Sequence, residues 1–141
     1  MKIKKALISD MIFIVIGSCS GVIGIVVPYL ISGSYDPVHA NSNSIFPVIN
    51  AAWEGLSLIP TLLIMVAVGL GLGFINPKRW LILGLTSILF LVILAIVEMS
   101  LHPTSHNLWP FEFILYFALI ALPAVIGTFI GSRIKKWSIA T

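Results

Sequence analysis

The chain has 141 residues, of which 59% are hydrophobic and 9% are charged. Because soluble domains carry roughly 25% charged residues, this composition excludes an ordinary soluble protein and indicates an integral membrane protein. The length suits one domain. The net charge of +3 does not indicate nucleic-acid binding, because the basic residues flank apolar stretches.

Four apolar stretches are long enough to cross a bilayer core, which requires about 20 residues. Since backbone polar groups cannot stay unpaired in lipid, each stretch is predicted to be a helix. The predicted helices cover residues 6–31, 56–75, 80–99 and 111–130. The sequence therefore predicts an all-α integral membrane protein, a single transmembrane domain over residues 1–141 that forms a four-helix bundle.

The charges give this bundle a predicted orientation. All eight basic residues fall on one side of the membrane that the helices define: Lys2, Lys4, Lys5, Lys78, Arg79, Arg133, Lys135 and Lys136. Only Asp10 accompanies them; the other acidic residues and all three histidines fall on the other side. By the positive-inside rule, both termini and the loop 76–79 are predicted to be cytoplasmic, and loops 32–55 and 100–110 to lie outside a plasma or inner membrane.

The first outer loop contains an apolar segment, residues 45–53, that is too short to span. We expect it to lie in the interface as a short helix or to fold over the mouth of the bundle. The tryptophans agree with these boundaries, since Trp53 and Trp109 fall at the outer interface and Trp80 and Trp137 at the inner one.

The N-terminal stretch imitates a cleaved signal. Lysines precede an apolar run, and Ile16-Gly17-Ser18-Cys19 resembles a lipoprotein cleavage box. The residues after Cys19 stay apolar, whereas a lipid-anchored chain usually begins with a polar tether. The stretch is therefore predicted to remain as the first membrane helix.

Glycines are placed as in helix contacts. Gly17, Gly21 and Gly24 lie near one face of the first helix, and Gly127 and Gly131 form a small-xxx-small pair on the fourth. Small residues let helix backbones approach closely in lipid, so these five are predicted to pack helices together. The alternative is a thin wall beside a groove for a lipid or small molecule.

Other residues predict departures from regular helix. Gly69, Gly71 and Gly73 alternate near the inner end of the second helix, where they favour a local loosening. Pro60 and Pro123 each free a carbonyl one turn earlier, which predicts kinks in the second and fourth helices.

Candidate chemistry gathers at the outer face. Glu98, His102 and His106 follow at a spacing of four, with Glu112 close behind, so they are candidates for a ligand site or a proton-linked site. His39, His102 and His106 are the candidate metal ligands, because imidazole together with carboxylate suits Zn²⁺, Cu²⁺ or Fe²⁺. The plainer interpretation is a polar rim in contact with water.

No motif names a reaction, so we expect a small non-enzymatic membrane protein that acts by contacts, as an accessory subunit or a partner- or lipid-binding bundle. One alternative is a small oligomeric transporter or channel that uses Glu98 at its outer mouth. The other is a metal-binding or metal-dependent membrane protein that uses the outer histidines. We expect no cofactor unless that divalent metal is bound. The expected partners are the lipid bilayer and a membrane protein or a second copy of the chain, and not nucleic acid.

Overall fold

A computed structural model describes residues 2–31, 51–52, 56, 58–101 and 109–140. Its helical elements are α1 (Lys2–Ile31), α3 (Leu58–Ile75), α4 (Trp80–Thr86), α5 (Leu89–Leu101), α6 (Trp109–Tyr116), the π-helix η1 (Phe117–Ala121) and α7 (Leu122–Ala140). Within these ranges there is no strand. Four stretches are long and apolar enough to cross a membrane: 11–31, 58–75, 80–101 and 110–139. The prediction of an all-α chain with four such helices is confirmed.

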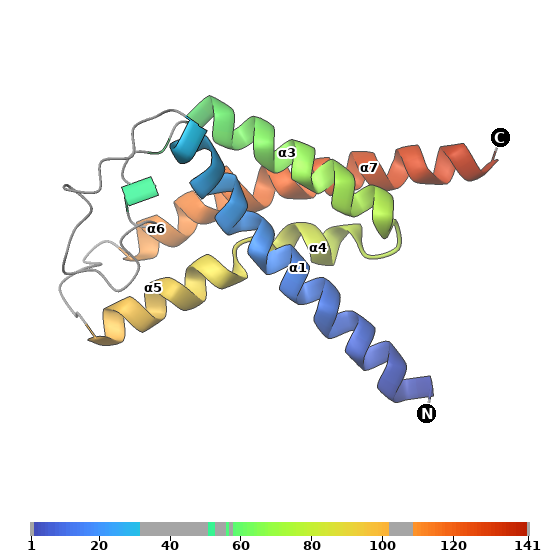
Figure 1. The fold of residues 1–141 in the computed structure, drawn as a ribbon, viewed down its shortest axis with the longest axis horizontal. Coiled ribbons are helices and arrows are strands. Elements are labelled where there is room, and N and C mark those ends of the chain that lie inside the picture. Colours follow the sequence, from blue (N-terminus) through green and yellow to red (C-terminus); the bar gives the residue numbers. More distant parts are fainter. Residues whose placement is uncertain (1, 32–50, 53–55, 57, 102–108, 141) are drawn as a thin grey trace.

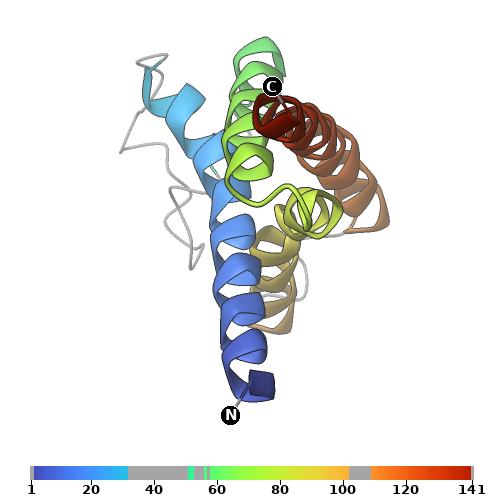
Figure 2. The same ribbon diagram turned by 90° about the vertical axis from the view of Figure 1, so that its right-hand side faces the viewer.

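The spans alternate in direction (Figures 1 and 2). α3 and α7 lie side by side, α6, η1 and α7 follow one another along one path, and α1 crosses the others at a steep angle. Both chain ends lie towards the right in Figure 1, at the end of the bundle that holds the link between α3 and α4. We call this the basic end and the opposite one the acidic end, after the charges that they carry.

The contact between α3 and α7 is a two-sided glycine seam. A Cβ added to Gly69 or Gly73 of α3 would collide with the backbone of α7 at Ala124 and Thr128. In return, a Cβ on Gly127 or Gly131 would collide with the backbone of α3 between Val66 and Phe74. Because close approach of backbones stabilises helix pairs in lipid, this seam accounts for the close pairing of α3 with α7. The predicted loosening at Gly69 and Gly73 is wrong: α3 is unbroken there.

The glycines of α1 face α4, the turn that follows it, and α3. Gly17 meets Leu83 and Thr86 of α4, Gly21 meets the Ser87 carbonyl, and Gly24 meets the sulfur of Met65 on α3. The face of α1 that contacts the rest of the bundle therefore carries glycines at its contact points. It is this lack of side chains that permits the steep crossing seen in Figure 1.

The third span is two helices, not the single helix predicted over 80–99. α4 ends at Thr86, Ser87 and Ile88 form a turn, and α5 begins at Leu89. The hydroxyls replace the missing helical donors: Thr86 Oγ1 donates to Leu83 O at 3.2 Å, and Ser87 Oγ donates to Gly84 O at 2.7 Å. Serine and threonine can satisfy the carbonyls that a break exposes in lipid, which makes this break tolerable.

The fourth span departs from α-helix at Pro123. One turn before this proline the chain forms η1, and the N–H of Leu122 donates to Phe117 O, five residues back. Proline has no N–H to continue the α-helical ladder, so the wider turn fits the prediction of a disturbance here. The predicted kink at Pro60 is wrong, because α3 begins at Leu58 and proline in a first helical turn loses no helical hydrogen bond.

The ends of the helices also differ from the predicted ones. α1 begins at Lys2 rather than residue 6, and α7 continues to Ala140 rather than 130. Lysine and arginine are good helix formers, so the helices continue through their basic flanks. The link at 76–79 is a turn in which Arg79 N–H donates to Asn76 O at 3.2 Å. Of the predicted interfacial segment the structure describes only Ala51 and Ala52, which are helical, and Ala52 is buried in the core.

Candidate functional site

A buried carboxylate marks the acidic end of the bundle. Glu98 lies near the end of α5, and only 3% of its surface is exposed. It shares a helical face with Leu94 and Ala95, which are buried as well. Glu98 therefore lies on the face of α5 that is directed into the bundle. Ionisable groups buried in a membrane domain are costly and are therefore functional candidates.

A second carboxylate approaches the same place from another helix. Glu112 lies in the first turn of α6, one turn before the buried Tyr116. Glu98 and Glu112 both lie within electrostatic range of the Tyr116 side chain. Tyr29 of α1 belongs to the same buried cluster as Tyr116. We call Tyr29, Glu98, Glu112 and Tyr116 the acidic cluster.

Each member of the acidic cluster makes at least one noncovalent interaction. Carboxylates accept hydrogen bonds and tyrosine hydroxyls donate them, so such a cluster can hold a cation or exchange a proton. Sequence reasoning found both glutamates and missed both tyrosines. The available signal was the spacing of four between Glu112 and Tyr116, which places them on one helical face.

The predicted metal ligands lie outside the described residues: His39, His102 and His106. Among the residues that the structure does describe, no group of three His, Cys, Asp or Glu side chains could hold a metal ion. Of the four ligand or proton-linked candidates, Glu98 and Glu112 are described, and they approach the same tyrosine. The metal site therefore stays a prediction from the sequence.

A second candidate site lies on the side of the third span. Next to the break, a groove of about 360 Å³ is lined by Ile82, Leu85, Thr86, Ile88, Leu89 and Val92. We call it the lateral groove. It forms where α4 and α5 meet at a turn, and its walls are apolar, because the Thr86 hydroxyl donates to Leu83 O and lies towards Gly17 of α1. A single helix was predicted here, and the available signal of a break was the group of small and hydroxyl residues in mid-span, Gly84, Thr86 and Ser87.

The remaining buried polar groups are hydroxyls. Ser18, Ser20, Thr128 and Ser132 donate to carbonyls of their own helices, at 2.6–3.0 Å. Such bonds satisfy the hydroxyl locally and leave it without a binding role. Thr61 on α3 is different: its side chain is 0% exposed, and its Oγ1 has no hydrogen-bond partner in the part of the chain that the structure describes.

Comparison with known proteins adds no assignment. No protein-family model, curated protein or solved structure matches this chain. What the acidic cluster and the lateral groove can do is therefore argued from their own chemistry and position.

Proposed function

We propose that the chain is a non-enzymatic membrane protein that acts by contacts, with the lateral groove receiving a transmembrane helix of a partner protein. It is inserted with both termini in the cytoplasm, because every basic residue of the sequence falls at or beyond the basic end. The observation that carries the proposal is the groove itself, an apolar recess on an exposed face of α4 and α5.

Three features of the groove suit a helix. Its volume of about 360 Å³ accommodates several side chains, as in contacts between membrane helices. It also lies beside a break, where the lining side chains do not form the regular ridges of an unbroken helix. A tightly packed pair, α3 and α7, provides the rigid support behind α4.

Site-specific photo-crosslinking in native membranes tests the proposal. A photoreactive amino acid at Leu85 lies in the groove, and one at Ile126 lies on α7 outside it. The two side chains are similarly exposed, 42% and 47%, and lie at one depth, because their neighbours Gly84 and Val125 touch. We expect a discrete protein adduct from Leu85 and none from Ile126. Adducts with lipid alone at both positions contradict the proposal.

A second candidate function, a small oligomeric transporter, is favoured by the acidic cluster. Glu98 is buried at the end of a broken span, and discontinuous helices with a buried carboxylate occur where ions and protons bind in transporters. Proton flux into liposomes with an internal pH dye tests it. Glu98→Gln should abolish a flux that Glu112→Gln only reduces, because Glu112 is the less buried of the two. Equal flux with wild-type protein and with empty liposomes excludes this function.

A further inference from the structure

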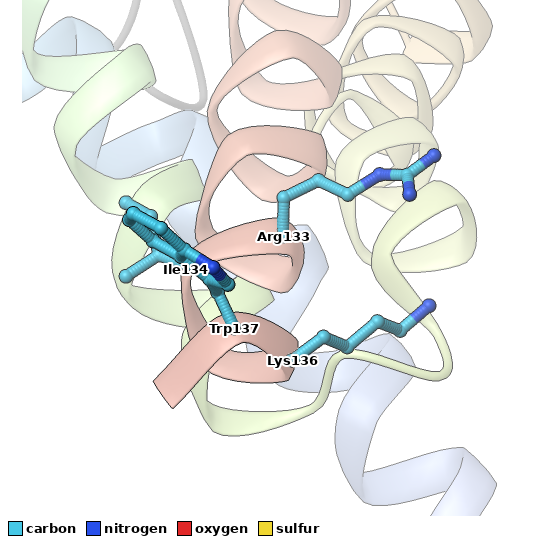
Figure 3. A pocket seen from close by; sticks show the side chains of 4 residues that line it. All are labelled: Arg133, Ile134, Lys136 and Trp137. Carbon is cyan, nitrogen blue, oxygen red and sulfur yellow. The ribbon is translucent and has the colours of Figure 1, made fainter. Parts of the chain in front are cut away.

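The last turns of α7 form an amphipathic recess at the basic end. It has a volume of about 480 Å³ and is lined by Arg133, Ile134, Lys136 and Trp137 (Figure 3). Arg133 and Lys136 extend to one side of the helix, whereas Ile134 and Trp137 extend to the other. The recess therefore has a cationic side and an apolar side, separated by the helix surface. Trp137 is 77% exposed.

The cationic side is held in place by aromatic rings. The Arg133 guanidinium lies 5.0 Å from the centre of the Phe129 ring, and Trp80 meets the same ring edge-on at 5.1 Å. Such cation–π contacts fix the direction of the guanidinium without neutralising it. The glutamates that the structure describes, Glu98 and Glu112, lie at the opposite end of the bundle. The sequence places one acidic residue at this end, Asp10, and it lies on α1 rather than on α7 with Arg133 and Lys136.

We propose that this recess binds an anionic phospholipid, with the phosphate between Arg133 and Lys136 and the glycerol and upper acyl region against Ile134 and Trp137. Guanidinium groups bind phosphate oxygens in a bidentate manner, and ammonium groups bind them as point charges. Tryptophan side chains prefer the headgroup level of a bilayer. The apolar side favours a lipid over free phosphate, because free phosphate has no apolar part that could contact Ile134 and Trp137.

The position of the recess along the span agrees with this ligand. The apolar stretch of the fourth span runs from Pro110 to Ile139, so its basic end reaches the level of the headgroups. Cytoplasmic leaflets carry anionic lipids, which attract basic segments next to a membrane helix. This inference rests on the proposed insertion and orientation and does not depend on the lateral groove or its partner.

Native mass spectrometry of the purified full-length protein tests it, with phosphatidylglycerol and phosphatidylcholine of the same acyl chains as probes. We expect phosphatidylglycerol to bind at least ~10-fold more tightly than phosphatidylcholine, which corresponds to about 1.4 kcal/mol. Arg133→Gln combined with Lys136→Gln should remove this preference. The control is Lys78→Gln combined with Arg79→Gln, which removes the same charge at the same end of the bundle but outside the recess. The control should keep the preference.

Three results overturn the inference. The first is equal binding of the two lipids to the wild type. The second is an equal loss in both double variants, which indicates only diffuse charge attraction. The third is displacement of phosphatidylglycerol by inorganic phosphate, which indicates a site for a soluble anion. If the recess double variant does not fold, Lys136→Gln alone replaces it, since this side chain is exposed. Flotation of the wild type with liposomes separately checks insertion.

Discussion

Two glycines of α3, only two residues apart, should respond oppositely to the same substitution. A Cβ at Gly73 would lie 2.6 Å from the Cα and the carbonyl carbon of Thr128, whereas a Cβ at Gly71 meets nothing within 4 Å. Carbon atoms pack at about 3.5–4.0 Å, so Gly73→Ala must push α7 away from α3 by on the order of 1 Å. The obstacle is backbone, which cannot rotate aside as a side chain can.

We expect Gly73→Ala to lower the free energy of unfolding by about 1–3 kcal/mol, the usual range for overpacking. Gly71→Ala removes a flexible residue from the same helix without a collision and should raise that free energy by up to about 1 kcal/mol. Titration of the detergent-solubilised protein with SDS, followed by circular dichroism, measures both. Equal shifts of the same sign, or no loss for Gly73→Ala, refute the glycine seam.

Three further outcomes follow from single contacts. Ser87→Ala should lower the free energy of unfolding by about 0.5–1.5 kcal/mol, because Gly84 O at the break then keeps only a 3.4 Å bond from the Ser87 N–H. Ser138→Ala removes an equivalent but exposed bond and should change this free energy by less than ~0.5 kcal/mol. Glu98→Ala should lower the free energy of unfolding by about 1–3 kcal/mol, because this buried carboxylate and its interaction are lost, and little change would contradict its placement. A double-mutant cycle of Glu98→Gln and Tyr116→Phe should show a coupling above ~0.5 kcal/mol, and additivity would place the two side chains in separate environments.

Hydropathy and length were enough to predict the four spans, because a bilayer leaves the backbone only the helix. The turn at 76–79 was equally visible, since Asn76-Pro77 combines a turn former with a residue that cannot continue a helix. Both features are local, so one sequence is sufficient to find them.

Helix partners were harder to predict, because partner choice is a property of two faces at once. The spacing of Gly127 and Gly131 predicted a contact, but nothing in that spacing names α3 as the partner. For the same reason Gly69 and Gly73 were predicted to loosen α3, although they form the other half of the seam. Glycine destabilises an isolated helix and stabilises a paired one in lipid, and only the fold distinguishes the two cases.

The candidate sites divide in the same way. Glu98 stood out because a carboxylate so close to an apolar span is costly, whereas its relation to Tyr116 depends on where the fold places α5 and α6. The lateral groove could be predicted only from the break at Ser87, and in the sequence this residue does not differ from other serines in apolar spans. The histidine site stays a prediction, since His39, His102 and His106 lie outside the described residues.

The proposed function requires that the bundle cross the membrane four times with both ends in the cytoplasm. Cys19 is the only cysteine, so a Cys19→Ser background allows single cysteines at Ser42 and at Ser138 to be labelled one at a time. A membrane-impermeant maleimide applied to intact cells should label the cysteine at position 42, and the one at position 138 only after permeabilisation. Labelling of both positions from the same side would contradict the four-span topology and every contact proposed from it.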